Sequence, residues 1–265
     1  MTVRLVGIDV DGTLVGSSGK VDPRVWEMAA AASARGIRLA LCSGRPAFGV
    51  AMEYARTLDP LGWHAFQNGA SILDLASGQS RSVPLPSRWV STLIEQARAS
   101  GQVLELYNDR ELAAESTSVW AREHAALLGV QFAPRAFESL AVPVVRAQWL
   151  LSPQRARELT ATPHPGLEVA QSTSPLMPGV QFVGLTDQSA SKATAMRVIA
   201  GQYGVALEDV MYVGDSGNDL SALRVVGYPI AMGNADAAVL AAAARTVATA
   251  DQGGVAEALA MALGL

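Results

Sequence analysis

The chain of 265 residues has one cysteine, little lysine and no excess of basic side chains. A single cysteine, Cys42, excludes an intrachain disulfide and a zinc site built from several cysteines, and it fits a reducing compartment. The 20 basic and 24 acidic side chains give a formal net charge of −4, so no basic field is available to hold a nucleic-acid polymer. A small molecule is therefore the expected partner.

Long apolar runs are also missing, and none of the existing ones would span a bilayer. The run over residues 2–10 meets Asp9 before it could form the apolar part of a signal peptide. The alanine-rich segment Ala235–Ala244 comes nearest to an apolar span, but Asp236 and Arg245 bracket it, and alanine favours a surface or half-buried helix. We expect a cytoplasmic protein with no membrane partner, as a monomer or weak dimer.

Apolar strand patterns alternate with helix patterns near both ends of the chain. In the first part we expect a strand over Val3–Val10, a helix over Pro23–Arg35, a strand over Ile37–Cys42, a helix over Pro46–Leu58 and a strand near His64–Phe66. In the last part we expect a helix over Ser191–Tyr203, a strand over Val210–Val213, a helix from Asp219, a strand over Pro229–Met232 and a terminal helix. This alternation predicts an α/β fold with a doubly wound, Rossmann-like parallel sheet.

The middle of the chain has a different pattern of predicted helices and strands. Helix patterns at Ser87–Ser100, Val119–Leu128 and Pro153–Thr160 are interleaved with strand patterns at Val103–Tyr107, Val144–Ser152, Leu167–Gln171 and Val180–Leu185. We therefore predict a sheet domain formed by residues 1–82 plus 187–265, with an α+β domain over residues 83–186 inserted into it. Ligands of such sheets usually bind beside the carboxyl ends of the strands.

Two carboxylates, Asp9 and Asp11, follow the first predicted strand, and Gly12 after them allows a sharp turn. Alternation along a strand would point both side chains in the same general direction. Carboxylates that lie close together need a cation or a shared proton. Taken alone, the pair is more simply explained as a solvated turn.

Polar residues also follow two other predicted strands. Ser43 and Gly44 come after the second strand, where a hydroxyl and an unobstructed backbone could contact an anion, although such a pair is also a common turn. The segment from Asp215 to Asp219 follows a late strand, and it includes Asn218. A helix cap needs only one of these residues, whereas oxygen ligands from Asp9, the Asp11 backbone carbonyl and Asp215 would suit Mg²⁺.

Lys192 is one of only two lysines in the chain, the other being Lys20. It lies at the start of a predicted helix, where the helix dipole favours anions over cations. A nearby phosphate or carboxylate would explain this placement, and an ordinary surface lysine is the alternative.

Together these segments resemble the haloacid dehalogenase superfamily, specifically its Cof-type phosphatases. The four motifs of that family are present in order, as Asp9-Val10-Asp11-Gly12-Thr13, Ser43, Lys192 and Gly214-Asp215-Ser216-Gly217-Asn218-Asp219. Segments similar to the family also occur at Asn68-Gly69-Ala70, at Ala231-Met232-Gly233-Asn234-Ala235 and at Gly253-Gly254-Val255-Ala256. The inserted domain lies where the family carries its cap domain.

The resemblance implies a magnesium-dependent phosphatase acting on a small organic phosphoester. Asp9 would be the nucleophile, and Asp11 would protonate the leaving alcohol and then activate water to open the aspartyl-phosphate. The implied phosphate ligands are Val10, Ser43, Gly44, Lys192 and Asn218. The implied Mg²⁺ site involves Asp9, Asp11 and Asp215, with Asp219 as a ligand or as a support for the ligands.

The resemblance transfers less well to the inserted domain, which is shorter than the cap of many relatives. Candidates for contact with the leaving group are Arg110, Glu115, Arg122, His124 and Arg146, although each is more simply explained as a solvated surface residue. The substrate itself is left open, with sugar phosphates, phosphoglycolate or phosphoglycerate derivatives, nucleotides and pyridoxal phosphate as the options.

Two other functions compete with the phosphatase. A phosphomutase of the same superfamily would pass the phosphoryl group to a second hydroxyl of the substrate, and nothing in the inserted domain marks such an acceptor site. A phosphate-sensing regulatory protein would carry the phosphorylated aspartate as a signal. Asp11 argues against the second alternative, because a neighbouring base would shorten the life of the acyl phosphate.

Overall fold

The computed structural model describes residues 2–174 and 176–264, which divide into two compact units. Unit 1 contains the chain up to Arg45, then Ala51–Arg81, and the part from Ser191 onwards. Unit 2 contains Pro46–Val50 and Ser82–Ala190. The two main boundaries differ by a few residues from the predicted ones at 82 and 187, and Pro46–Val50, which the prediction had placed in the sheet domain, belongs to unit 2.

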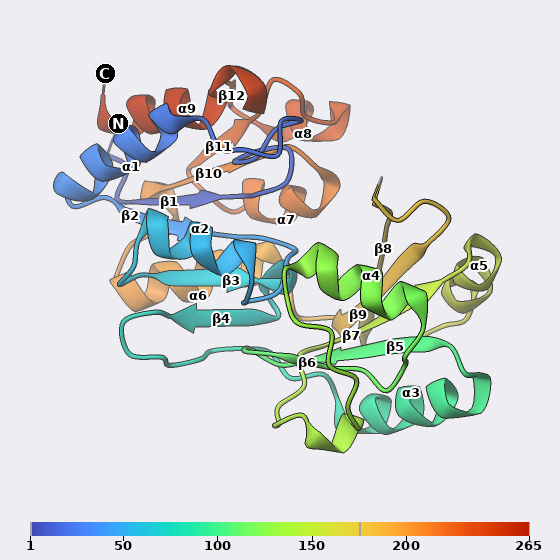
Figure 1. Ribbon diagram of the computed structural model, residues 1–265. Helices are drawn as coiled ribbons and strands as arrows, with labels where there is room; N and C mark the ends of the chain where they lie inside the picture. Colours follow the sequence, from blue (N-terminus) through green and yellow to red (C-terminus); the bar gives the residue numbers. More distant parts are fainter. Residues whose placement is uncertain (1, 175, 265) are drawn as a thin grey trace. The chain divides into compact units, whose positions relative to one another are not determined.

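The main sheet of unit 1 is parallel throughout, in the order β12-β11-β10-β1-β2 (Figure 1). Every residue of β1 is buried, as expected for a central strand covered on both faces. The doubly wound α/β fold predicted from the sequence is thereby confirmed. The strands are β1 (Leu5–Ile8), β2 (Arg38–Leu41), β10 (Val210–Gly214), β11 (Tyr228–Ala231) and β12 (Arg245–Thr246).

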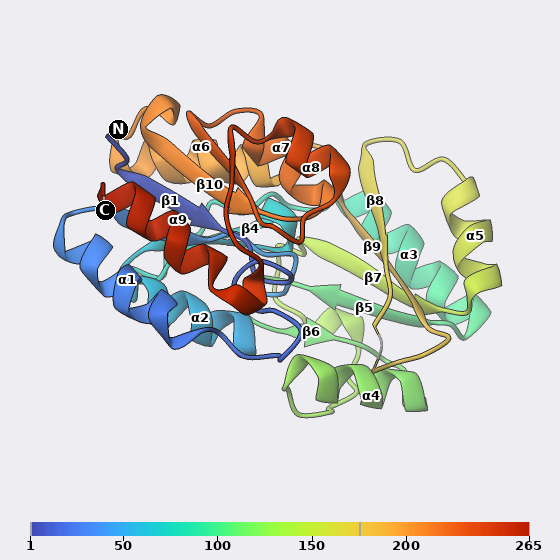
Figure 2. The ribbon, with the colours of Figure 1, turned by 90° about the horizontal axis from the view of Figure 1, so that it is seen from above.

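Helices cover both faces of this sheet (Figure 2). One face carries α1 (Pro23–Ala34), α2 (Val50–Leu58) and α9 (Gly254–Leu263), and the other carries α6 (Lys192–Tyr203), α7 (Leu220–Leu223) and α8 (Ala237–Ala242). None of the helices formed by residues 2–174 and 176–264 combines the length and apolar character that crossing a bilayer requires.

Two predicted helices are shorter in the structure. The helix expected from Pro46 begins only at Val50, because the preceding segment belongs to unit 2, where the Phe48 ring stacks on Tyr107 with centroids 6.1 Å apart. The alanine-rich segment is helical only over α8, where Val239 is buried, and it ends before the edge strand β12.

An antiparallel hairpin of β3 (Trp63–Phe66) and β4 (Ser71–Asp74) extends unit 1 beyond β2. It is joined to the end of β2 by a parallel bridge between Cys42 and Ala65. His64 of this hairpin is fully buried, and its Nδ1 accepts a hydrogen bond from the Leu41 N–H at 3.0 Å. The other ring nitrogen, Nε2, therefore carries the proton and donates to the Asp59 carbonyl oxygen at 2.8 Å.

The buried, neutral His64 should make the stability of unit 1 sensitive to mild acid. Burial lowers the pKa of His64 to about 4, so between pH 6.5 and 4 the unfolded chain binds a proton that the folded chain does not. The contribution of His64 to the free energy of unfolding should therefore fall as the pH falls, by about 2 kcal/mol between pH 7 and 5, whereas the raised pKa values of Asp9 and Asp215 act in the opposite direction, so the loss is read as the difference between wild type and a His64 variant. Urea unfolding at the two pH values measures this loss.

A matched pair of variants assigns the effect. His64→Gln should remove this part of the pH dependence, whereas His164→Gln, in unit 2, should retain it. An equal pH dependence in wild type and His64→Gln would contradict the assignment.

Unit 2 is a five-stranded antiparallel sheet in the order β6-β5-β7-β9-β8, with α3 and α5 on one face and α4 on the other (Figures 1 and 2). This is the α+β arrangement expected for the inserted segment. The strands are β5 (Val103–Tyr107), β6 (Leu112–Ala113), β7 (Arg146–Leu151), β8 (Leu167–Ser172) and β9 (Gln181–Asp187), and the helices are α3 (Ser87–Ser100), α4 (Val119–Leu128) and α5 (Pro153–Ala161).

Alternation along β5 and β7 gives the two faces of this sheet different characters. Leu104, Leu106 and Trp149 belong to the apolar cluster shared with α3 and α5. Glu105 and Gln148 point to the other face, where both carry hydrogen bonds with His124 of α4. A buried polar network therefore lies under α4.

Candidate active site

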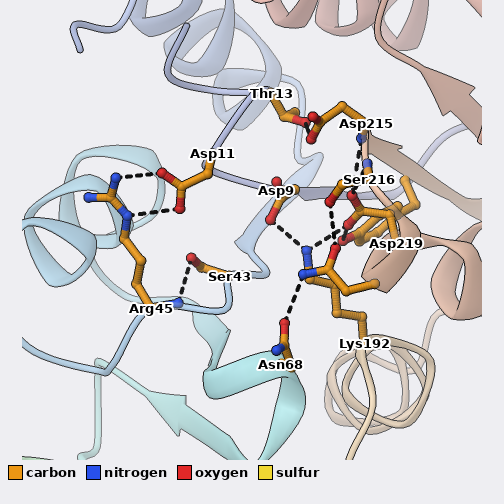
Figure 3. Close-up of polar contacts among 12 residues, drawn as sticks. Asp9, Asp11, Thr13, Ser43, Arg45, Asn68, Lys192, Asp215, Ser216 and Asp219 are labelled. Carbon is orange, nitrogen blue, oxygen red and sulfur yellow. Dashed lines mark hydrogen bonds and ion pairs between the residues drawn. The ribbon is translucent and has the colours of Figure 1, made fainter. Parts of the chain in front are cut away.

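The polar residues predicted from the sequence come together at the carboxyl ends of the parallel strands of unit 1 (Figure 3). Asp9 follows β1, Ser43 follows β2, and Asp215 follows β10. These three strands are neighbours in the sheet, so their ends share one edge. Lys192 reaches the same place from the first residue of α6.

Lys192 forms two short ion pairs in the interior of the site. Its Nζ lies 2.5 Å from Asp9 Oδ1 and 2.6 Å from Asp219 Oδ1, and all three side chains are buried. Burial disfavours the ammonium, but the two carboxylates raise the pKa of Lys192 above its usual value. The two carboxylates explain why a positively charged lysine is tolerated at the N-terminus of α6.

Asp9 is under opposing influences. Burial raises the pKa of its carboxyl to about 8, while the Lys192 ammonium lowers it. The Val10 N–H also donates to this carboxylate and favours its charged form. An additional positive charge beside Asp9 would complete the stabilisation of the carboxylate at neutral pH.

Asp219 is held by four donors. Its Oδ1 accepts from Lys192 and from the Tyr212 hydroxyl, each at 2.6 Å, and its Oδ2 accepts the backbone N–H groups of Asp215 and Ser216, each at 3.0 Å. Four hydrogen bonds use the accepting capacity of a carboxylate. Asp219 therefore fixes the β10 turn and Lys192 in one arrangement.

Asp215 lies against the turn that follows Asp9. Gly12 has a φ of +82°, and a Cβ at this position would overlap the Asp215 carboxylate, so the glycine is needed for both the turn and the close approach. Thr13 Oγ1 donates to Asp215 Oδ1 at 3.0 Å. Burial raises the pKa of Asp215 to about 6.

The carboxylates of Asp9, Asp215 and Asp219 lie close together, and those of Asp9 and Asp215 have accepting capacity left for a divalent cation. Each offers an oxygen, and these oxygens lie within 4.8 Å of one another. Asp9 and Asp219 both pair with the ammonium of Lys192 and Asp215 lies beside them, so three carboxylates with one ammonium leave an excess of negative charge at a partly buried position. Oxygen-only ligands match Mg²⁺ or Ca²⁺ better than a softer metal.

The Asp11 side chain lies apart from this group. It is 62 % exposed and forms a two-bond ion pair with Arg45, with Nε to Oδ2 at 2.9 Å and Nη2 to Oδ1 at 2.5 Å (Figure 3). The sequence analysis expected the backbone carbonyl of Asp11, and not its carboxylate, to bind Mg²⁺. The Asp11 carboxylate does not belong to the group formed by Asp9, Asp215 and Asp219. In this structure the Asp11 carboxylate is directed to Arg45 and not to the acidic cluster.

The predicted phosphate ligands lie around Asp9. Ser43 is fully buried, and its Oγ accepts the Arg45 N–H at 3.1 Å. Asn218 donates through Nδ2 to Asn68 Oδ1 at 3.0 Å, and a Cβ on Gly44 would come within 3.2 Å of the same oxygen. Asn68 thereby links the loop after β2 to the loop after β10.

Four residues of the site had no role in the sequence analysis: Thr13, Arg45, Asn68 and Tyr212. Arg45 follows Ser43 and Gly44 directly, so its place beside the predicted phosphate ligands was a usable signal. The sequence gave no signal for Tyr212, because this residue lies within an apolar strand pattern.

The candidates named in the inserted domain have different environments. Glu115 pairs with Arg98 at 2.5 Å, and Arg122 lies over the Phe132 ring. For His124 the surface interpretation was wrong, because its Nδ1 lies 2.8 Å from the buried Glu105 carboxylate and its side chain is 6 % exposed. His124 lies on the buried face of α4, where its hydrogen bond to Glu105 offsets the cost of burying the imidazole.

Arg110 lines a pocket of about 250 Å³ within unit 2. The residues that line the pocket include Glu105, the aromatic residues Phe48 and Phe132, and Arg135. Arg146 is half-buried, with its guanidinium 5.5 Å from the Tyr107 ring centroid. The pocket thus combines apolar walls with groups of both charges, as small-molecule sites do.

Comparisons with known proteins show the family of this chain. Residues 6–259 match the family model of the haloacid dehalogenase-like hydrolases. A putative phosphatase of Bacillus subtilis strain 168 is 24% identical over 264 residues, which cover 97% of each chain.

Solved structures are similar over the whole chain. A haloacid dehalogenase-like hydrolase from Bacteroides thetaiotaomicron has a TM-score of 0.81 at 27% identity, covering 98% of this chain and 99% of that one. A Thermotoga maritima protein has a TM-score of 0.84 at 19% identity, covering 98% and 97%. Because the family model spans nearly the whole chain, this protein belongs to the haloacid dehalogenase-like hydrolases, as its motifs had indicated.

Proposed function

We propose that this hydrolase is a magnesium-dependent phosphatase, which cleaves a small organic phosphomonoester through a phosphorylated Asp9. The observation that carries the proposal is the position of Asp9, buried at the end of β1 with Lys192 on one oxygen and the carboxylate of Asp215 nearby. The whole-length similarity to a putative phosphatase supports the same reaction.

In the first step, an oxygen of Asp9 attacks phosphorus and the ester oxygen leaves. Lys192, Ser43 and Asn218 would bind phosphoryl oxygens, together with the backbone N–H groups of Val10 and Gly44. Preorganised donors of this kind stabilise the charge that develops during phosphoryl transfer. The two-step route replaces one difficult displacement with two easier ones.

Asp11 would serve as the acid and then as the base. Its carboxyl would protonate the leaving alcohol, and the resulting carboxylate would take a proton from the water that attacks the aspartyl-phosphate. Its ion pair with Arg45 holds the side chain in a defined orientation without occupying Asp9.

The Mg²⁺ ligands in this proposal are Asp9, the backbone carbonyl of Asp11 and Asp215. A bound Mg²⁺ would neutralise the repulsion between an anionic nucleophile and an anionic substrate and polarise a phosphoryl oxygen. Asp219 supports the site rather than binding the cation, since each of its oxygens already accepts two hydrogen bonds.

Unit 2 would act as the cap domain and select the leaving group. Its pocket beside Arg110 offers a candidate for contacts with a sugar-sized molecule, because it has both aromatic and charged walls. The cytoplasmic location and the monomeric or weakly dimeric state expected from the sequence stay predictions.

Removal of the cation is the direct test of this function. Phosphate release from a panel of sugar phosphates, phosphoglycolate, nucleotides and pyridoxal phosphate should occur with Mg²⁺ and fall to background with EDTA. Activity should return when excess Mg²⁺ is added, because the acidic cluster is built by the fold and not by the cation. Release that persists in EDTA would contradict the metal requirement, and no release from any ester would contradict the phosphatase.

A further inference from the structure

Tyr212 is a buried tyrosine at the centre of the site for which the proposed mechanism has no role. It lies in β10, and its side chain is fully buried. Its hydroxyl donates to Asp219 Oδ1 at 2.6 Å. The same oxygen accepts a hydrogen bond from Lys192 Nζ, also at 2.6 Å.

The neighbouring strand is built to accept the Tyr212 ring. Gly7 of β1 is the register partner of Tyr212. A Cβ on Gly7 would lie 2.8 Å from Tyr212 Cδ2 and 2.7 Å from Met196 Sδ, closer than such contacts allow. Gly7 therefore leaves room for both the Tyr212 ring and the Met196 side chain.

The shared oxygen connects the hydroxyl to the nucleophile. Lys192 Nζ lies 2.6 Å from Asp219 and 2.5 Å from Asp9 (Figure 3). With the hydrogen bond from the Tyr212 hydroxyl to Asp219, the contacts form a chain from Tyr212 through Asp219 and Lys192 to Asp9. An ammonium has three N–H donors, and two of them are used by these carboxylates. Asp219 and Asp9 fix the position of the Lys192 nitrogen and therefore the direction of its third N–H.

We propose that Tyr212 is a positioning residue, which anchors Asp219 so that the third N–H of Lys192 is aimed at a phosphoryl oxygen in the transition state. Without the phenol, Asp219 Oδ1 would have Lys192 as its one side-chain donor, and the ammonium would move toward Asp219 and away from Asp9 and the phosphoryl group. Misalignment of a preorganised charge costs rate more than substrate affinity. The inference rests on the proposed phosphatase function.

Tyr212→Phe keeps the ring in its slot and removes only the hydroxyl. In saturating Mg²⁺ it should lower kcat about tenfold, with KM changed less than about twofold. The matched control is Tyr203→Phe at the far end of α6, where the hydroxyl accepts the Trp63 N–H at 2.7 Å. This control should keep the wild-type kcat. Replacing Tyr212 with 4-aminophenylalanine, which retains a donor, should restore much of the loss.

A second readout needs no activity, because the chain has only two lysines. Protein labelled with ¹⁵N at the lysine side chains should give Nζ resonances from Lys20 and Lys192 alone. Tyr212→Phe should shift the Lys192 resonance and leave Lys20 unchanged, and Tyr203→Phe should shift neither.

The outcomes separate this inference from the proposed function. If wild type hydrolyses an ester while Tyr212→Phe keeps its kcat, or loses rate with an unmoved Lys192 resonance, the positioning role is wrong and the phosphatase stands. A rise in KM at unchanged kcat would also overturn it. If wild type hydrolyses no ester, the phosphatase is wrong and the positioning role is lost with it.

Discussion

Asp9→Asn should abolish phosphate release, with a loss on the order of 10⁴-fold or more, as expected when the nucleophile of a covalent mechanism is removed. An amide has nearly the shape of a carboxylate but does not attack phosphorus at a useful rate. Asp9 contributes an oxygen to Lys192 and to the acidic cluster, so the change also weakens the electrostatics of the site. Release of phosphate from the best ester of the panel measures the effect.

Loss of activity must be distinguished from loss of fold. Lys192 keeps its ion pair with Asp219 in Asp9→Asn, so its ammonium is not left without a carboxylate, and the variant should stay folded in a thermal unfolding measurement. Asp22→Asn is the matched control, because Asp22 caps α1 and belongs to none of the four motifs, and asparagine is an equally good cap. Substantial turnover by folded Asp9→Asn would rule out Asp9 as the nucleophile.

Asp11→Asn should separate the two chemical steps. Without an acid and base, turnover should fall by about 10²- to 10⁴-fold. With a substrate whose leaving group needs little protonation, such as p-nitrophenyl phosphate, the first step should persist while hydrolysis of the aspartyl-phosphate stalls. The phosphorylated protein should then accumulate, and intact-protein mass spectrometry would detect the added phosphoryl group.

Two variants assign this intermediate. Asp9→Asn combined with Asp11→Asn should carry no phosphoryl group, which would place the group on Asp9. Arg45→Gln breaks the ion pair with Asp11 but keeps the carboxylate, so it should not accumulate the intermediate to the same extent. Long-lived phosphorylation of wild type, unchanged in Asp11→Asn, would instead favour a regulatory protein.

The sequence by itself determined the parallel core and the edge where the site is built. Buried parallel strands have near-continuous apolar patterns, and those of β1, β2 and β10 end in glycine and polar residues that are visible without a structure. Because adjacent parallel strands end at one edge, the placement of Asp9, Ser43 and Asp215 together followed from their positions at strand ends. The ordered motifs then identified the family.

Only the tertiary structure decided which side chains are partners. Asp9 and Lys192 are 183 positions apart, and Asp11 and Arg45, which follow two neighbouring strands, are 34 positions apart, so neither contact leaves a local pattern. Tyr212 and His124 illustrate the same limit, since each has an ordinary apolar or helical neighbourhood in sequence. Their environments depend on a buried carboxylate of a different element, Asp219 for Tyr212 and Glu105 for His124, which lie 7 and 19 positions away, and no pattern of residues along the chain predicts these contacts.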